Sequence, residues 1–335
     1  MHYKTLGKTG LQVSALGFGG IPIQRIDAEG TKALIHRMAD CGVNYIDTAR
    51  GYTVSEEYLG YALEGIRDKF VLATKTMART KDAMAKDIDV SLGNLRTGYI
   101  DLYQVHNPSL ADLDTVTAPG GALEALLDAK AAGKIGHIGV TAHSVEVFEK
   151  ALSYDWVETI MFPYNIVETQ GDDLIRRCQE QNVGFICMKP LAGGALEDAT
   201  LALRFLNTNN NISVVIPGMA DPAELDQNLA AVNNTAPLSA EELEQIAAIR
   251  RELGTQFCRR CGYCAPCTVG INIPGVFLFE GYLRRYGLAD WARDRYAALP
   301  VKASACIGCG ECEPRCPYNL PIREMLKKSA EGFGE

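Results

Sequence analysis

The chain has 335 residues, of which 47% are apolar, and it carries a formal net charge of −8 at pH 7. This length and apolar content suffice for one large domain with a buried core and a second, smaller one. The acidic balance excludes nucleic acid as the main partner, because binding to a phosphate backbone depends on basic patches. No run of about 18 apolar residues and no cationic leader is present, so the sequence predicts a cytoplasmic protein without a membrane segment.

Eight apolar, β-branched segments of the kind that form buried parallel strands recur along the first two thirds of the chain. They are residues 13–19, 44–48, 70–75, 100–106, 137–141, 159–165, 184–190 and 212–218. Segments with helical spacing of apolar residues lie between them, for example Ile88, Leu92 and Leu95. This alternation predicts an α/β fold, an eight-stranded (β/α)8 TIM barrel, because no Gly-x-Gly-x-x-Gly turn follows any early strand as a doubly wound sheet would require.

Two further features delimit the predicted barrel. Turn-forming residues from Gly7 to Gly10 separate two short extended segments, which predicts a β-hairpin able to plug one end of the barrel. Ser239 and Glu242 form a capping box for a helix that ends near Gly254. We therefore expect a barrel domain over residues 1–253 and a second domain over 254–335.

The second domain contains eight of the eleven cysteines, in two rows. The rows are Cys258, Cys261, Cys264, Cys267 and Cys306, Cys309, Cys312, Cys316. The second row, followed by Pro317, is the Cys-x2-Cys-x2-Cys-x3-Cys-Pro run of bacterial ferredoxins, in which three thiolates hold one [4Fe–4S] cluster and the fourth reaches the other. The spacing thus predicts two [4Fe–4S] clusters.

The first row departs from that run, since its last gap is two residues and Thr268 stands where proline would be. The sequence therefore does not decide which of the two clusters Cys267 would bind. Zinc is the alternative metal, but a zinc ribbon needs pairs of cysteines, whereas each row here supplies a triplet plus one. The remaining cysteines, Cys41, Cys178 and Cys187, lie among apolar residues and are expected to be core thiols.

The segment between the rows has helical rather than stranded character, as in Gly281–Gly287 and Trp291–Tyr296. The second domain resembles the mainly α-helical type of two-cluster ferredoxin domain. From Gly254 onward there are eleven Lys and Arg against eight Asp and Glu. The arginines beside the cysteines either offset the negative charge of the clusters or form a docking face for an acidic electron carrier such as a ferredoxin or flavodoxin. They are Arg259, Arg260, Arg284, Arg285 and Arg315.

Four polar residues stand at or after the ends of predicted barrel strands, where active sites of such barrels lie. They are Asp47, Tyr52, Lys75 and His106. A phenol has a pKa near 10 and becomes a better acid beside an ammonium group, which an aspartate can hold charged and oriented. With a histidine to position a carbonyl oxygen, the four residues suit proton donation to a carbonyl substrate.

The motifs around these residues resemble the aldo-keto reductase family. The resemblance extends over nearly all of the first 235 residues and rests on residues 44–52, on Leu-Ala-Thr-Lys75-Thr, on residues 101–106 and on residues 162–165. It implies that Asp47, Tyr52, Lys75 and His106 are a catalytic tetrad with Tyr52 as general acid, and that hydride comes from a nicotinamide. An aldehyde or ketone, or the corresponding alcohol, would be the substrate.

The resemblance also implies a nicotinamide pocket formed by Thr141, His143, Tyr164 and Asn165, with Tyr164 as the stacking ring. Met161 stands where the family usually has glutamine. The rest of the cofactor would contact Lys189, Gly193, Gly194, Pro217, Gly218 and Asn228. The adenosine end lacks the basic residues of NADP-using members and offers Glu224, which favours NAD(H).

A nicotinamide transfers two electrons as hydride, whereas a [4Fe–4S] cluster accepts one, so a direct exchange between the two domains has no simple mechanism. A flavin would split the pair, but no flavin motif is visible. Three interpretations stay open. The protein is a carbonyl reductase with structural or regulatory clusters, an iron–sulfur protein that passes electrons from a ferredoxin-like partner to a flavin or substrate in the barrel, or an electron-carrying scaffold with an inactive barrel.

Overall fold

The computed structural model describes residues 1–335 and divides into two compact units. The barrel unit comprises Met1–Asn165, Thr169–Leu191 and Asp198–Pro237. The C-terminal unit comprises Leu238–Glu335 together with two short segments, Ile166–Glu168 and Ala192–Glu197. The predicted boundary at 253/254 differs from this division, because the helix Ala240–Leu253 groups with the C-terminal unit.

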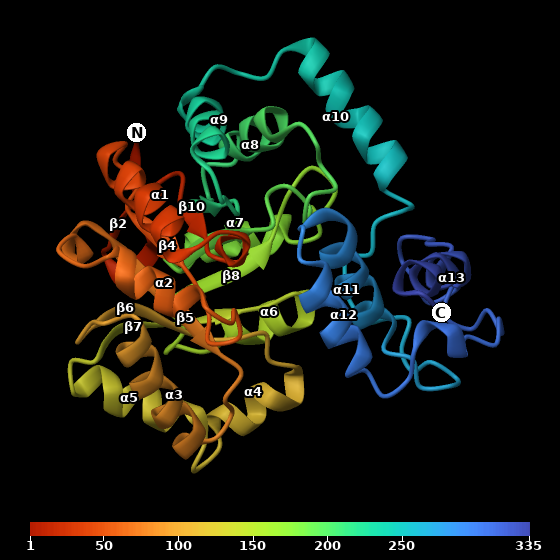
Figure 1. Ribbon diagram of the computed structural model, residues 1–335, viewed down its shortest axis with the longest axis horizontal. Coiled ribbons are helices and arrows are strands. Elements are labelled where there is room, and N and C mark those ends of the chain that lie inside the picture. The colour runs from red at the N-terminus through yellow and green to blue at the C-terminus, as the bar shows by residue number, and fades with distance from the viewer. The chain divides into compact units, whose positions relative to one another are not determined.

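Eight parallel strands form the wall of the barrel unit in the order β10-β9-β8-β7-β6-β5-β4-β3 (Figure 1). They are β3 (Phe18–Gly19), β4 (Tyr45–Asp47), β5 (Val71–Thr76), β6 (Ile100–Val105), β7 (Ile135–Thr141), β8 (Thr159–Pro163), β9 (Gly184–Met188) and β10 (Val214–Ile216). Backbone hydrogen bonds close the wall between its first and last strands, from Gly17 N to Val215 O at 2.8 Å and from Gly19 N to Pro217 O at 2.9 Å. The predicted (β/α)8 barrel is confirmed.

The interior of the barrel follows from the two-residue period of its strands. Side chains that point inward form one apolar cluster, which includes Tyr45, Ala73, Leu102 and Ile186. The alternate residues of the same strands point outward and pack against the helices. Two residues beyond the inward apolar positions, at the carboxyl ends of the strands, the inward positions become polar, and there the candidate site begins.

Helices cover the outside of the strands (Figure 1). They are α1 (Ala28–Asp40), α2 (Ser55–Ala62), α3 (Lys81–Asn94), α4 (Leu110–Thr117), α5 (Ala122–Ala131), α6 (Val145–Leu152), α7 (Asp172–Glu180), α8 (Ala199–Asn207) and α9 (Pro222–Asn233). Side-chain caps fix several of their starts. Asp27 accepts a hydrogen bond from Gly30 N before α1, and Ser109 with Asp112 forms a capping box before α4.

The predicted N-terminal hairpin is confirmed and closes one end of the barrel. Its antiparallel strands are β1 (Tyr3–Thr5) and β2 (Gln12–Ser14). Leu6 and Val13 belong to the interior cluster and are fully buried. Lys8 N donates to Asn182 O at 2.6 Å, at the start of β9. The amino-terminal end of the barrel is therefore sealed, which leaves the carboxyl ends of the strands for the site.

The C-terminal unit is helical, as the sequence predicts. Its helices are α10 (Ala240–Leu253), α11 (Ile273–Arg285), α12 (Ala289–Ala297) and α13 (Ile322–Phe333). The capping box of Ser239 and Glu242 starts α10. A small core of apolar residues, including Val276 and Leu326, packs with Cys264, Cys312 and Cys316.

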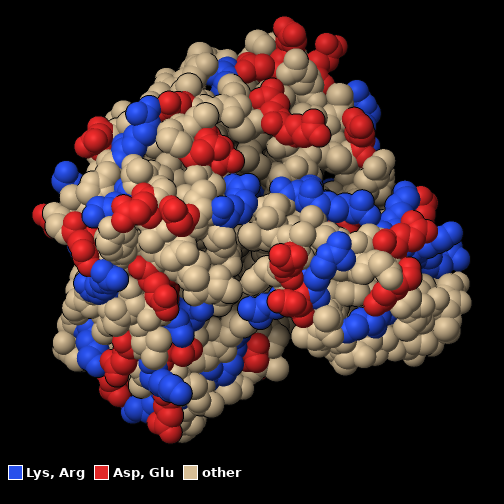
Figure 2. All heavy atoms as spheres, in the orientation of Figure 1, with Lys and Arg blue, Asp and Glu red and all other residues tan.

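No helix of the structure is long and apolar enough to span a membrane. Both basic and acidic side chains are spread over the surface of the barrel unit that Figure 2 shows.

Candidate functional site

Asp47 and Lys75 lie at the carboxyl ends of the adjacent strands β4 and β5 and point into the barrel. Each is 2% exposed, and Lys75 Nζ forms an ion pair with Asp47 Oδ2. Lys75 Nζ also donates to Thr48 O at 2.8 Å. A buried charged pair of this kind is held only where its remaining hydrogen-bonding capacity is satisfied, and the backbone carbonyl supplies one such partner.

Tyr52 and His106 lie above this pair. Tyr52 follows β4 in a turn in which its backbone N–H donates to Ala49 O at 3.0 Å. The Tyr52 and His106 rings meet edge to face, with centroids 6.2 Å apart and an interplanar angle of 87°. Lys75 Nζ lies 4.9 Å from the centroid of the Tyr52 ring. The structure therefore brings all four predicted tetrad residues together.

The environment of the four residues shifts their acid–base properties. Burial lowers the pKa of Lys75 and raises the pKa of Asp47, while their mutual attraction opposes both shifts. Burial, with the positive charges of Lys75 and Arg79, lowers the pKa of His106 to about 3. His106 is therefore neutral near pH 7 and can donate one hydrogen bond and accept one, as an orienting group should.

Glu56 is a buried carboxylate behind the site that the sequence reasoning missed. It lies on α2, is 1% exposed, and accepts hydrogen bonds from Thr74 Oγ1 and Ser91 Oγ, both at 2.8 Å. Arg50 Nη1 donates to its other oxygen at 2.7 Å. This network joins the turn between Asp47 and Tyr52 to β5 and α3. The sequence could have indicated Glu56, because it is a polar residue on the face of an amphipathic helix that packs against the barrel.

Asn107 is a second residue that the sequence reasoning did not select. It follows His106 with φ of +45°, a backbone conformation that asparagine tolerates better than most residues. Its N–H donates to Thr141 Oγ1 at 2.8 Å, and its Oδ1 lies 2.9 Å from His143 Nδ1. Two of the predicted nicotinamide residues, Thr141 and His143, are thereby fixed beside the end of β6.

Tyr164 has partners other than those expected of a stacking ring. It is 4% exposed, its ring stacks on Phe205 with centroids 6.1 Å apart, and its hydroxyl donates to Asp172. Asn165 Nδ2 donates to Lys189 O at 3.0 Å, which ties the ends of β8 and β9 together. That Tyr164 stacks on a nicotinamide stays a prediction. In the structure the ring that stacks on Tyr164 is that of Phe205.

The predicted contacts to the remainder of a nicotinamide cofactor lie after β9 and β10. Lys189 has φ of +54°, and Pro217 O accepts from Gly19 N at the seam of the barrel, next to Gly218. Asn228 is 3% exposed on α9. Gly193 and Gly194 belong to the C-terminal unit, where both have positive φ and Arg285 Nε donates to Gly193 O at 3.0 Å.

Side chains occupy part of the hydrogen-bonding capacity at the start of α9. Asp221 accepts a hydrogen bond from Glu224 N at 2.9 Å, and Glu224 Oε2 accepts one from Ala220 N at 2.6 Å. Arg25, from the segment after β3, lies 3.6 Å from Glu224 Oε1. An arginine does therefore stand at the position where the sequence showed only Glu224.

One set of cysteines in the C-terminal unit shares an apolar pocket. Cys267, Cys306, Cys309 and Cys312 line it, together with Val269, Ile273, Ile307 and Leu326. Thr268 Oγ1 lies 3.4 Å from Cys309 Sγ. The pocket thus groups the last cysteine of the first row with the first three of the second row.

The other four cysteines form a second set. Cys261 and Cys316 lie near enough to Cys258 to affect its pKa, and Cys258, Cys261 and also Cys312 lie near enough to Cys264 to affect its pKa. Burial raises the pKa of Cys258, and burial raises the pKa of Cys264 to about 12. All eight thiols are free of disulfides, and no group of three or more His, Cys, Asp and Glu side chains could hold a single metal ion. A [4Fe–4S] cluster makes a different demand, because each thiolate binds a different iron.

The arginines beside the cysteines are mostly engaged within the C-terminal unit. Arg259 is 7% exposed, and its Nε donates to Val167 O at 3.1 Å while its guanidinium lies 3.9 Å from the Tyr318 ring centroid. Arg260 pairs with the fully buried Glu168 at 2.9 Å. Burial removes these two arginines from any docking face. Arg284 and Arg315 are exposed, and each lies within 4 Å of a glutamate.

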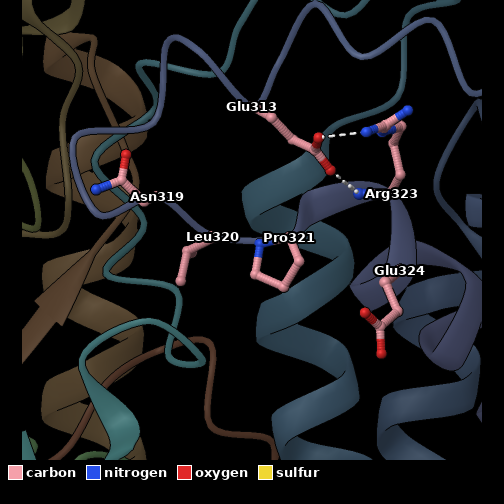
Figure 3. A pocket seen from close by; sticks show the side chains of 6 residues that line it. All are labelled: Glu313, Asn319, Leu320, Pro321, Arg323 and Glu324. Carbon is pink, nitrogen blue, oxygen red and sulfur yellow. Dashed lines mark hydrogen bonds and ion pairs between the residues drawn. The ribbon is translucent and has the colours of Figure 1, made fainter. Parts of the chain in front are cut away.

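A hollow of about 460 Å³ on the C-terminal unit is not lined by cysteine (Figure 3). Glu313, Asn319, Leu320, Pro321, Arg323 and Glu324 surround it. Glu313 accepts hydrogen bonds from the backbone N–H of Arg323 at 3.1 Å and from its guanidinium at 2.7 Å. The Glu313 carboxylate therefore binds the first turn of α13. It also neutralises the Arg323 guanidinium at the edge of the hollow.

A scan of family models places the chain among known proteins. The model for the aldo/keto reductase family matches residues 15–200, and the model for a 4Fe-4S dicluster domain matches residues 257–321. Because the first match covers more than half of the chain, the protein belongs to the aldo/keto reductase family, and it carries a C-terminal 4Fe-4S dicluster domain. The family defines it as an oxidoreductase.

Individual relatives agree with this assignment. L-galactose dehydrogenase of Arabidopsis thaliana is 27% identical over 303 residues, which cover 74% of this chain and 94% of that protein. Aldo-keto reductase YhdN of Bacillus subtilis is 31% identical over 225 residues, covering 60% of this chain and 66% of that protein. The holo form of the aldo-keto reductase AKR11C1 from Bacillus halodurans aligns with a TM-score of 0.65 at 26% identity, covering 74% and 96% of the two chains.

Proposed function

We propose that the protein reduces an aldehyde or ketone with NAD(P)H and that its C-terminal unit holds two [4Fe–4S] clusters. A bound nicotinamide supplies the hydride. Tyr52 donates the proton to the carbonyl oxygen, and the Lys75 ammonium lowers the cost of the phenolate that remains. Asp47 keeps Lys75 charged and in place, and the neutral His106 orients the carbonyl by hydrogen bonding.

The observation that carries this proposal is the packing of the tetrad. A lysine whose Nζ lies 4.9 Å from the Tyr52 ring, paired with a buried aspartate and facing an edge-on histidine, has no evident structural purpose at the end of a barrel. Burying an ion pair costs free energy that apolar residues of similar size would avoid. The arrangement is best explained by the acidity that it gives to Tyr52.

The choice between NAD(H) and NADP(H) depends on Glu224 and Arg25. Glu224 would repel a 2′-phosphate and accept a hydrogen bond from a 2′-hydroxyl, which favours NAD(H). Arg25 is 3.6 Å from Glu224, and this pairing diverts its charge from a phosphate. We therefore keep NAD(H) as the proposed cofactor.

The two sets of cysteines fit two clusters in which one ligand is exchanged between rows. Cys267 would join Cys306, Cys309 and Cys312, whose side chains line the same pocket. Cys316 would join Cys258, Cys261 and Cys264. This is the exchange of the fourth cysteine that two-cluster ferredoxins make. The proposed compartment is the cytoplasm, where thiols stay reduced.

The test is turnover by anaerobically purified protein with NADH or NADPH and a panel of aldehydes and ketones. Tyr52→Phe removes only the hydroxyl and should lower kcat by about 10²- to 10⁴-fold, with the affinity for the reduced cofactor little changed. Tyr58→Phe, on α2 and outside the tetrad, is the matched control and should keep wild-type turnover. Equal turnover by Tyr52→Phe and wild type would remove the proposed mechanism.

A second function is favoured by one observation, the exposure of the second cysteine row. Cys309 is exposed and its neighbour Ile307 is 65% exposed, so a cluster in that pocket would lie close to solvent. Such a cluster could accept electrons from a ferredoxin-like partner and pass them to a flavin or substrate in the barrel. Cluster reduction by a reduced ferredoxin, followed by substrate reduction without any nicotinamide, would support this alternative.

A further inference from the structure

Gln104 is a fully buried amide in a barrel interior that is mainly apolar. It lies on β6, two residues before His106, and is 0% exposed. The sheet register places it opposite Lys75 of β5 on one side and opposite Gly139 of β7 on the other. It therefore occupies the layer of side chains that supports the catalytic pair.

The nitrogen of the Gln104 amide forms a hydrogen bond with Asp47. Gln104 Nε2 donates to Asp47 Oδ1 at 3.1 Å, while Lys75 binds the other carboxylate oxygen, Oδ2. An ionised carboxylate only accepts hydrogen bonds, so this contact fixes which end of the amide faces Asp47. Asp47 is thus held from two sides by two different strands.

A second buried polar residue, Thr159, lies across Gly139 from Gln104. Gln104 Oε1 and Thr159 Oγ1 are both buried without a hydrogen-bond partner among the protein atoms. Thr159 is opposite Gly139 in the register, so the three residues lie side by side on β6, β7 and β8. A Cβ atom at Gly139 would lie 2.2 Å from Thr159 Oγ1 and 3.1 Å from Gln104 Cγ. Only glycine leaves both polar side chains in place.

We propose that Gln104 is a positioning residue for the tetrad, which holds the Asp47 carboxylate in the orientation that pairs with Lys75 and thereby sets the acidity of Tyr52. The hydrogen bond from Gln104 Nε2 to Asp47 Oδ1 and the register of Gln104 opposite Lys75 carry this proposal. The proposal deepens the carbonyl-reductase function and rests on it.

The effect of Gln104 on Asp47 can be separated from the effects of the charged groups around Asp47. Lys75 on β5 faces Asp47 directly, and Glu56 on α2 acts on Lys75 from behind. His106 after β6 is affected by the Lys75 charge, and Tyr45 on β4 by the Asp47 charge. Gln104 is an uncharged donor among these groups, so replacing it changes no net charge. Its hydrogen bond lowers the pKa of Asp47 against the effect of burial.

The test is Gln104→Met, which keeps the size of the side chain and removes the donor. Two properties are measured against pH: kcat for carbonyl reduction, and the carboxyl ¹³C shift of Asp47 in aspartate-labelled protein, assigned with Asp47→Asn. We expect the acid limb of the kcat profile and the pKa of Asp47 to move upward by about one pH unit, and kcat to fall more than KM changes. Leu102→Met, on the same strand, is the control and should shift neither property.

Two further variants guard against a misfolded protein. Thr159→Val is a second control and should shift neither property, because Thr159 Oγ1 forms no hydrogen bond with Gln104. Gln104→Glu places a second carboxyl group beside Asp47 and should move the acid limb further upward, because two neighbouring carboxylates resist joint ionisation. Asp47 pKa values in Gln104→Met and Gln104→Glu equal to that in wild type would overturn the proposal. A wild-type protein that reduces no carbonyl would contradict the proposed function, and the Asp47 pKa would still decide whether Gln104 positions it.

Discussion

At the scale of single residues, the site depends on keeping His106 neutral. Its pKa is lowered to about 3 by burial together with the charges of Lys75 and Arg79. A protonated imidazole would repel the Lys75 ammonium and offer no acceptor. In the proposed mechanism, therefore, Tyr52 donates the proton and His106 holds the carbonyl oxygen.

This shift of the His106 pKa makes stability depend on pH. In the unfolded chain a histidine binds its proton below about pH 6.5, whereas the folded protein resists protonation down to about pH 3. The stabilising effect is complete above pH 6.5 and is lost as the pH falls toward 3, because the unfolded state then binds more protons. The free energy of unfolding of wild type, relative to His106→Gln, should fall in this window with a slope of up to about 1.4 kcal/mol per pH unit.

Urea denaturation at a series of pH values measures this difference. A constant difference between the two proteins from pH 6.5 to pH 4 would contradict the neutral, buried state of His106. The substitution removes the titrating group and retains a side chain that can form hydrogen bonds.

The tetrad could be predicted from the sequence because each of its members stands at or just after the end of a predicted strand. Gln104 could not, because a single polar residue in an apolar segment gains meaning only when its neighbours across the sheet are known. The register that sets Gln104 between Lys75 and Gly139 is a property of three strands together. The contact between the Tyr164 and Phe205 rings could not be predicted from the sequence either, because Phe205 lies on α8, far along the chain.

At the scale of elements, α2 and α3 hold the turn that carries Tyr52. Their contact requires a glycine, because a Cβ atom at Gly60 on α2 would lie 2.1 Å from Asn94 O, a backbone atom at the end of α3. Gly93 on α3 is also helical but has nothing within 4 Å of such a Cβ. The two glycines form a matched pair in which one is needed for packing and the other is not.

Alanine substitutions should therefore have opposite effects. Gly93→Ala should raise the free energy of unfolding by about 0.8–1.0 kcal/mol, because alanine favours the helix. Gly60→Ala should lower it by about 1–3 kcal/mol and also lower kcat, because overpacking displaces α2 and its Glu56 network. Chemical denaturation and turnover of both variants measure the effects. A stabilised Gly60→Ala protein would contradict this close packing.

The eight barrel strands were predicted at the right places, with ends that differ by a few residues. The first predicted strand, residues 13–19, is divided between β2 of the hairpin and the short β3. The period of apolar residues cannot show this division, because Leu16 and Phe18 are buried in either arrangement. The grouping of α10 with the C-terminal unit was likewise not visible, since it depends on contacts such as Arg250 Nε to Ile166 O.

At the scale of the whole molecule, the proposed carbonyl-reducing site and a 4Fe-4S dicluster domain are joined in one chain. The barrel unit contains Asp47, Tyr52, Lys75 and His106, and the C-terminal unit contains two rows of four cysteines. Because a hydride cannot pass directly to a single cluster, we propose that the barrel alone reduces the carbonyl. We propose no flavin in the barrel.

The most direct test measures iron, sulfide, zinc and flavin per chain in anaerobically purified protein, followed by titration with NADH and NADPH while the visible absorbance is recorded. We expect about eight irons and eight sulfides, no zinc and no flavin, since two [4Fe–4S] clusters are proposed. We further expect nicotinamide oxidation that requires an added aldehyde or ketone and leaves the cluster spectrum unchanged. A bound flavin, or bleaching of the clusters by NADH without a carbonyl substrate, would contradict this expectation and show one electron path through both units.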